Sequence, residues 1–207
     1  MDVMIDLETF GTSNNAVIVQ IGAVIFDRKT GKIEQNTFFA NVTADSCVKA
    51  GMEMDASTVE WWLKQSKEAR ESLFTEPRLD VVSVLTQFNA WLEKMFSLGE
   101  PAGSTLEKAW RNRIHLWSHA TFDYNILQNA YLKAGVPAAF NFRGARDLRT
   151  LTDLGEVHYW TPEYEQAHGR VGVHHNALDD CIYQVGYTVE ALNKVRNSLH
   201  PDTPIVY

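Results

Sequence analysis

The feature that most constrains the fold is a nearly continuous run of aliphatic residues at 16–26, AVIVQIGAVIF. A short run rich in valine and isoleucine predicts a strand that is buried on both faces. Gly22 within it predicts either a β-bulge or a close approach of another backbone. The segments 2–7 (DVMIDL) and 33–42 (IEQNTFFANV) predict a first and a third strand, with a turn at 27–31. Three strands therefore begin the chain.

Helices are predicted to dominate the remainder. The predicted helices are 57–66, 79–97, 122–134 and 177–195, with a short strand at 114–117 and a short strand and helical turn around 145–154. Ser57 and Glu60 have the spacing of a capping box, and Gly135 and Pro137 end the third helix. Strands followed by alternating helices and strands indicate the α/β class, with a mixed sheet covered by helices on both faces.

Composition narrows the classes of protein to consider. The 207 residues are 45% hydrophobic and 22% charged, which fits one globular domain spanning 1–207. We expect neither a membrane span nor a signal peptide, and hence a cytoplasmic location. Cys47 and Cys181 are too few for a disulfide framework or a zinc site. The net charge of −7 argues against a broad basic surface for duplex DNA. A carboxylate cluster that binds divalent cations could still receive nucleic acid.

Two carboxylates end the first predicted strand. Asp6 and Glu8 are two residues apart and so point to the same face. Such a pair repels unless it is solvated, protonated or bound to a cation, and its oxygens suit Mg²⁺ or Mn²⁺. A solvated strand end is the simpler interpretation of the pair alone. Asp123 follows the strand at 114–117, where it could equally serve as a helix cap.

A third polar group, HHNALDDC, precedes and opens the last helix. Asn176 is a good N-cap, which leaves His175 on the loop and places Asp180 in the first turns, so that the two could converge. Asp179 is the better candidate for a structural acid, serving the free amides of the helix. We expect His174 to be a loop residue with no required part in the site.

Together these segments resemble the three motifs of the DEDDh (DnaQ-like) 3′ to 5′ exonucleases. The matching residues are D-x-E-T ending the first strand, F-D after a later strand, and H-x-A-x-x-D opening the C-terminal helix, in that order from Asp2 to about Leu192. The stretch STVEWWLKQSKEAR at 57–70 resembles a subgroup that includes phage-type DNA exonucleases and Rv2179c-like exoribonucleases. His119 departs from the family pattern, in which asparagine is common at that place. The resemblance implies a ribonuclease H-like fold.

The resemblance also implies a mechanism. Asp6, Glu8, Asp123 and Asp180 would hold two divalent cations, Mg²⁺ or Mn²⁺, for in-line phosphodiester hydrolysis. We expect Asp6 to bridge both ions, with Glu8 and Asp180 completing one site and Asp123 holding the other ion largely through water. His175 would take the proton of the attacking water.

The expected substrate is the 3′ end of single-stranded nucleic acid, which is hydrolysed to nucleoside 5′-monophosphates. By resemblance, Thr9 and Gly11 lie near the terminal sugar and phosphate, and Phe10 lies against a base or, alternatively, in the core. DNA is slightly favoured, with an exoribonuclease that trims RNA 3′ overhangs as the alternative. The aromatic and basic residues after 109, which include Trp160 and Arg170, suit a single strand, and one of Trp61 and Trp62 is expected in the core. Relatives are often dimers, so a homodimer is one of the oligomeric states left open.

Two other interpretations compete with the nuclease. D-L-E-T superficially matches D-x-D-x-T of haloacid dehalogenase-type phosphatases, but these need an acidic pair that ends a strand, and they leave Asp123 and His175 without a role. An inactive ribonuclease H-like module that only binds nucleic acid or protein is the other. The presence of all five expected polar groups argues against it.

Overall fold

A computed structural model describes residues 2–96 and 110–199. Within these ranges the strands form a six-stranded sheet of order β4-β3-β2-β1-β5-β6. The strands are β1 (Asp2–Thr9), β2 (Ile18–Phe26), β3 (Phe38–Val42), β4 (Arg78–Leu79), β5 (His115–Ser118) and β6 (Ala145–Asp147). The pairs β1–β2 and β2–β3 are antiparallel, whereas β1–β5, β5–β6 and β3–β4 are parallel, so the sheet is mixed as predicted.

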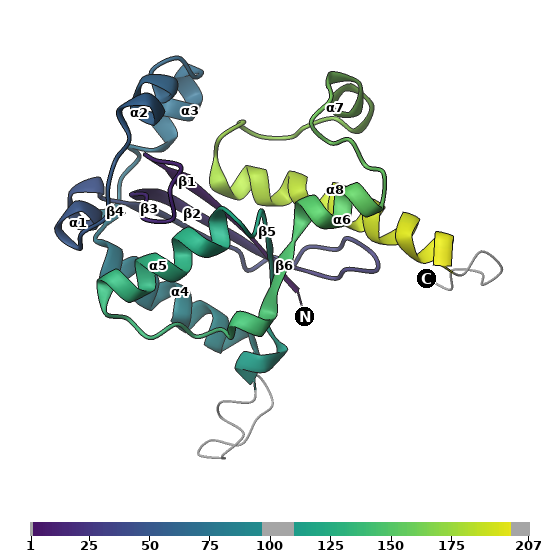
Figure 1. Cartoon of the computed structure of the whole chain (residues 1–207), viewed down its shortest axis with the longest axis horizontal. Helices are drawn as coiled ribbons and strands as arrows, with labels where there is room; N and C mark the ends of the chain where they lie inside the picture. Colours follow the sequence, from purple (N-terminus) through teal and green to yellow (C-terminus); the bar gives the residue numbers. More distant parts are fainter. Residues whose placement is uncertain (1, 97–109, 200–207) are drawn as a thin grey trace.

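Helices cover both faces of this sheet, which confirms the predicted architecture (Figure 1). The α-helices are α1 (Ala44–Lys49), α2 (Ala56–Trp62), α3 (Lys67–Ser72), α4 (Val81–Phe96), α5 (Asp123–Ala134), α6 (Leu148–Leu154), α7 (Pro162–His168) and α8 (Ala177–Leu199), and short 3-10 turns lie at Trp110–Arg113 and Phe142–Gly144. Helices α4 and α5 pack on one face, and α6 and α8 pack on the other. Along the described chain, none of the helices combines the length and the apolar run that a membrane crossing needs.

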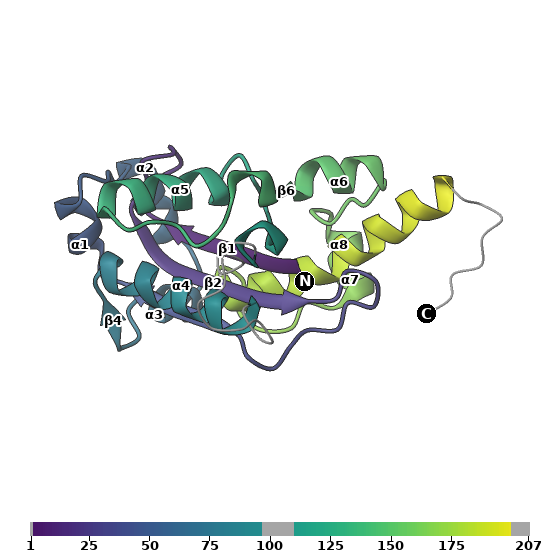
Figure 2. The same cartoon turned by 90° about the horizontal axis from the view of Figure 1, so that it is seen from below.

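The pleat of β1 divides its side chains between the two faces. Val3, Ile5 and Leu7 belong to the apolar cluster that contains α4 and α5. Met4 belongs to the cluster with Cys181 and other residues of α8. Because side chains alternate along a strand, Asp6 and Glu8 share the face of Met4 and point toward α8. Helix α8 runs alongside β1 and β2 before it extends past the sheet (Figure 2).

Several predicted boundaries were wrong. The third strand begins at Phe38 rather than at residue 33, because the polar stretch 34–37 is largely exposed and only Ile33 forms an isolated bridge, with Phe26. The capping box at Ser57 is also wrong: α2 begins at Ala56 and ends at Trp62, with Asp55 at its N-cap.

Two further differences concern the helices. Helix α4 begins at Val81, because Leu79 pairs in β4, and the predicted end at residue 97 lies outside the described residues. Helix α7 was not predicted. Its start does carry recognisable signals, since Thr161 caps it by accepting a hydrogen bond from Tyr164 N and Pro162 occupies its first turn.

Gly22 marks a close approach rather than a bulge. A Cβ atom there would lie 2.3 Å from the carbonyl carbon of Ala177, the first residue of α8. The irregularity of register falls elsewhere, between Glu8 and Thr9. The missing side chain thus lets α8 begin directly against the centre of the sheet.

We expect Gly22→Ala to displace the start of α8, because the contacting atoms of Ala177 are backbone. The free energy of unfolding should fall by about 1–3 kcal/mol, as for other overpacked sites, and the side chains that α8 carries toward β1 should be misplaced. Urea denaturation and activity measure the two effects. Gly186→Ala is the matched control: a Cβ atom at Gly186 meets no atom of residues 2–96 or 110–199 within 4 Å, so that variant should gain stability from helix propensity. A Gly22→Ala protein as stable as the wild type would contradict the argument.

Candidate active site

The register of β1 against β2 positions the first two acids. Asp6 lies opposite Gly22, and Glu8 lies opposite Gln20. Both carboxylates are more than nine-tenths buried. Two buried carboxylates on one face of a strand need a partner, which comes from α8.

The first turn of α8 is fixed by polar contacts to the sheet and to its own cap. Ala177 N donates to the side-chain carbonyl of Gln20 over 3.0 Å. Asn176 Oδ1 accepts from the amides of Leu178 and Asp179 at 3.1 and 3.3 Å, as predicted for an N-cap. This anchoring brings Asp180 to β1, where ligand oxygens of Asp6, Glu8 and Asp180 lie within 4.8 Å of one another. The structure thus brings together three of the four acids that were predicted to converge.

Asp123 lies in the same cavity but is held differently. It is the first residue of α5, and its two carboxylate oxygens accept from Leu7 N at 3.2 Å and from His119 N at 3.0 Å. These amides tie α5 to β1 and β5. The close trio consists of Asp6, Glu8 and Asp180, so Asp123 is a neighbour of the trio rather than a member, in keeping with a contact through water.

Two residues that contact the acids did not emerge as site residues from the sequence. Gln184 Nε2 donates to Asp6 Oδ1 over 2.6 Å. Arg170, one of the basic residues predicted to suit a single strand, forms an ion pair with Asp180 and lies over the Tyr183 ring. Gln184 follows Asp180 by four residues, so helical spacing could have indicated it. Arg170 lies on the loop before α8, and no periodic signal marks it.

Burial and mutual repulsion strongly shift the pKa values of the acids. Burial raises the pKa of Asp6 to about 7, against the opposing effects of the Gln184 hydrogen bond and the Arg170 charge. Burial and the charge of Asp6 raise the pKa values of Glu8 and Asp123 well above their ordinary ranges. Glu8 Oε1 is buried and has no hydrogen-bond partner among the residues that the structure describes. An unpartnered carboxylate oxygen beside two further carboxylates fits a bound divalent cation, which would reverse these shifts.

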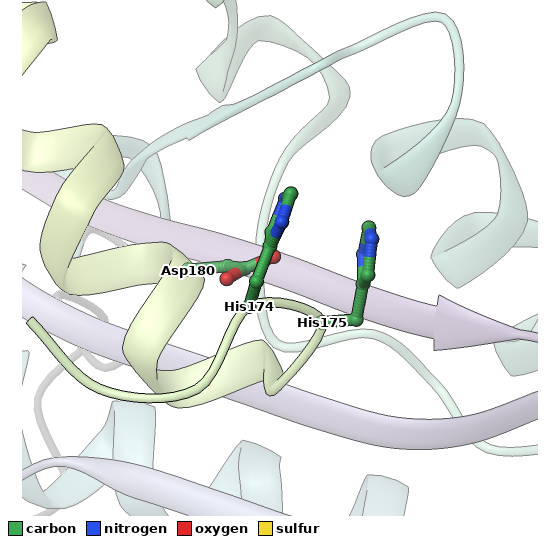
Figure 3. A group of neighbouring side chains, drawn as sticks. All are labelled: His174, His175 and Asp180. Carbon is green, nitrogen blue, oxygen red and sulfur yellow. The ribbon is translucent and has the colours of Figure 1, made fainter. Parts of the chain in front are cut away.

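His175 lies next to this cluster on the loop before α8, as predicted (Figure 3). Its φ of 65° places it in the left-handed region, which histidine tolerates better than most residues. Its ring contacts Trp61 edgewise, with 4.8 Å between ring centroids, and stacks on His174 at 3.9 Å. Burial, followed by the charges of His174 and Arg170, lowers the pKa of His175 to about 4, so its imidazole is neutral at pH 7.

Asp179 shapes the loop that carries His175. Its Oδ2 accepts from Val173 N over 2.7 Å. Gly172, at φ 90°, leaves the space that the Asp179 carboxylate fills. Asp179 is therefore structural, as predicted, although it serves the preceding loop.

The acids and His175 line one cavity of about 500 Å³, together with Thr9, Gly11 and residues of α2. Trp62 is buried and its Nε1 donates to Thr9 O over 2.8 Å, whereas Trp61 is 42% exposed, which confirms the prediction that one tryptophan lies in the core. Phe10 is partly buried against the cluster that contains α4 and α5. His119 and Arg149 also line the cavity, and burial lowers the pKa of His119 to about 4.

Comparisons with known proteins give matches to nucleases. A family model described as the 3′-5′ exoribonuclease Rv2179c-like domain matches residues 1–192. An exodeoxyribonuclease of Enterobacteria phage T4 is 26% identical over 99 residues, which cover 44% of this chain and 43% of the phage protein. The match thus spans less than half the length of that relative.

Solved structures of similar fold include two nucleases in complexes. A 3′-exonuclease described as recognising the 3′ end of a histone mRNA stem-loop has a TM-score of 0.54 and 15% identity, with 93% of this chain and 81% of that chain covered. The zinc-bound ExoI–single-stranded DNA complex of E. coli has a TM-score of 0.53 and 16% identity, with 97% and 41% covered. These similarities confirm the predicted ribonuclease H-like fold.

Proposed function

Since this chain belongs to the Rv2179c-like 3′-5′ exoribonuclease domain family, we propose that it is a 3′ to 5′ exonuclease that hydrolyses single-stranded nucleic acid from the 3′ end to nucleoside 5′-monophosphates. The observation that carries this proposal is the convergence of Asp6, Glu8 and Asp180 in one cavity beside His175. We propose that residues 1–207 act as a single DEDDh domain. The homodimer and the cytoplasmic location stay predictions.

The proposed cofactors are two divalent cations, Mg²⁺ or Mn²⁺. Asp6, Glu8 and Asp180 would hold them with Asp123, whose oxygens already accept two backbone amides and are suited to a contact through water. When bound, such ions activate a water molecule and stabilise the charge that develops on the phosphate. The unpartnered Glu8 oxygen and the raised carboxylate pKa values support this assignment.

His175 is the proposed general base. Its neutral imidazole at pH 7 can accept the proton of the attacking water. An anionic phosphate in the cavity would oppose the lowering of its pKa by Arg170 and move that pKa back toward neutrality. Trp61 and His174 hold the ring in place from two sides.

The part of the cavity that is lined by the end of β1 and by α2 would receive the terminal nucleotide. Thr9 and Gly11 line it at the end of β1, and the exposed Trp61 offers a face on which a base can stack. Arg149 supplies local positive charge in a chain of net charge −7. The proposed role of Phe10 against a base stays a prediction.

The phosphatase interpretation fits this geometry poorly. Asp179 and Asp180 open a helix rather than end a strand, and Asp179 binds the backbone of the preceding loop. Asp123 and His175 both line the cavity and would have no part in phosphatase chemistry.

We propose DNA as the favoured substrate and RNA as the second candidate. The phage relative is an exodeoxyribonuclease, which supports DNA, whereas the family description names an exoribonuclease, which supports RNA. Single-stranded DNA and RNA of one sequence, each labelled at the 5′ end, would be incubated with Mg²⁺ or with chelator. We expect a metal-dependent ladder that shortens from the 3′ end and 5′-monophosphates as products, with the faster ladder identifying the sugar. Cleavage from the 5′ end, or none with either polymer, would contradict the proposal.

The pH dependence of stability tests the cation site without a substrate. The pKa of Asp6 is about 7 in the folded state and 3.8 in the unfolded chain, so between these values the folded state holds the extra proton and raising the pH lowers the free energy of unfolding. His175, with its pKa lowered from 6.5 to about 4, acts in the opposite sense, but only below pH 6.5. In chelator, Tm should therefore fall as the pH rises from 6.5 through about 7, the folded-state pKa of Asp6.

Added Mn²⁺ should reverse that fall, because the cation binds the deprotonated acids. A cation at about 100 times its Kd adds about 2.7 kcal/mol, which corresponds to about 5–10 °C in Tm for a chain of this size. Differential scanning fluorimetry at several pH values measures both effects. A Tm that is independent of Mn²⁺ at pH 8 would remove the cations from the proposed site.

A further inference from the structure

A second group of metal-ligating side chains adjoins the acids. Ligand atoms of His174, His175 and Asp180 lie within 4.8 Å of one another. Figure 3 shows the two rings side by side on the loop, with the Asp180 carboxylate reaching toward them from α8. The rings are stacked, with an interplanar angle of 15°. His174 is exposed, and in the proposed hydrolysis it neither holds the catalytic cations nor accepts a proton.

The chemistry of this group differs from that of the acids. Two imidazoles and one carboxylate form the three-ligand set that binds Zn²⁺ with a fourth position left open. Mg²⁺ prefers oxygen ligands, so it favours Asp6 and Glu8 over the histidines. We propose that His174, His175 and Asp180 form a site for Zn²⁺ or a similar borderline ion such as Co²⁺, and that this ion inhibits hydrolysis.

The geometry requires only a modest closure of the side chains. Ligand atoms about 2.0–2.1 Å from a tetrahedral Zn²⁺ lie about 3.4 Å from one another, and rotation of the imidazoles can shorten the present separations toward this value. Arg170 is the competitor, since its guanidinium pairs with Asp180 and must give way to the ion.

Inhibition follows from shared residues, and this part of the inference rests on the proposed function. His175 is the proposed base, and Asp180 is a proposed ligand of the Mg²⁺ or Mn²⁺ ions. An ion bound to both takes the lone pair that His175 would use and removes Asp180 from the acid trio. The two kinds of ion therefore compete for the protein.

Metal titration tests the site itself. Zn²⁺ binding is measured by calorimetry and Co²⁺ binding by its visible absorption, in the wild type, in His174→Ala and in His168→Ala. Loss of the His174 ligand should weaken binding by about tenfold or more and weaken the visible Co²⁺ bands, because one of the two nitrogen ligands is removed. His168, an exposed histidine of α7 whose Nδ1 lies 3.0 Å from Tyr164 O, is the control and should bind as the wild type does. Equal affinity in the wild type and His174→Ala would overturn the site.

Activity tests the inhibition. In saturating Mg²⁺, inhibition by Zn²⁺ is measured against each protein's own rate without Zn²⁺, because His174 stacks on His175 and its loss can change that rate. The half-inhibitory Zn²⁺ concentration of His174→Ala should rise by the same factor as its Kd. Identical inhibition of both proteins would place the inhibitory ion at the acids and overturn the proposal. A chain that binds Zn²⁺ through His174 but hydrolyses neither polymer would refute the proposed function and leave the metal site standing.

Discussion

Asp6→Ala is expected to reduce hydrolysis about 10³-fold or more. Asp6 is a buried member of the acid trio, and its removal takes a ligand from the proposed cations and leaves Gln184 Nε2 without its acceptor. Asp6→Asn should be equally inactive, because an amide is a poor cation ligand, while it keeps the volume and an acceptor for Gln184. Steady-state rates in Mg²⁺, together with Mn²⁺ titration, measure the loss.

Stability should move in the opposite direction from activity. Burial raises the pKa of Asp6 to about 7, so its charged form is disfavoured in the metal-free fold at pH 8. Asp6→Asn should therefore have a higher Tm than the wild type in chelator and a lower one in Mn²⁺. Such a reversal of the order of the two Tm values identifies a site whose acids bind cations but lower the stability of the metal-free protein. Full Mg²⁺-dependent activity in either variant would remove Asp6 from the mechanism.

Asp2→Asn provides a control on the same strand and the same face. Asp2 is buried at the other end of β1, where it pairs with Arg28 over 2.9 Å and accepts from Trp117 Nε1 over 2.8 Å. Breaking that pair should lower the free energy of unfolding. It should leave Mn²⁺ affinity and turnover unchanged, which separates the chemistry of Asp6 from the general cost of altering a buried aspartate in β1.

The sequence predicts those parts of the fold in which the local residue pattern and the packing of the whole chain favour the same structure. The aliphatic run of β2 can be little other than a buried strand, and α5 ends at Gly135, as its sequence indicates, in the left-handed conformation. The pair Asp6 and Glu8 follows from the period of two in a strand. Asn176 correctly separates His175 from α8.

Contacts between distant segments are the parts that the sequence did not predict. The approach of Ala177 to Gly22 sets where α8 meets the sheet, and Gly22 alone left a bulge as an equal alternative. Arg170 pairs with Asp180 because the loop between α7 and α8 turns back over the helix, which no periodic pattern records. The prediction of a strand at 33–37 was wrong for a local reason. A polar, largely exposed stretch beside a single isoleucine does not extend the buried strand beyond an isolated bridge.

His175→Ala is expected to lower kcat by about 10²–10⁴-fold, the usual contribution of a general base, and to leave Mn²⁺ affinity at the acids within about twofold. The ring contacts Trp61 and His174, so its loss opens a space next to the acid trio that added imidazole can enter. Partial recovery of the rate with imidazole is the signature of a lost proton acceptor, which a merely structural residue would not give.

The backbone at His175 makes a second variant necessary. Its φ of 65° is unfavourable for alanine, so a loss of activity in His175→Ala could arise from a displaced loop. His175→Asn keeps a residue that tolerates this conformation but cannot act as a base. If His175 is the base, both variants lose turnover equally and only the alanine variant responds to imidazole. If His175→Asn retains the wild-type rate, His175 serves the loop and another group must accept the proton.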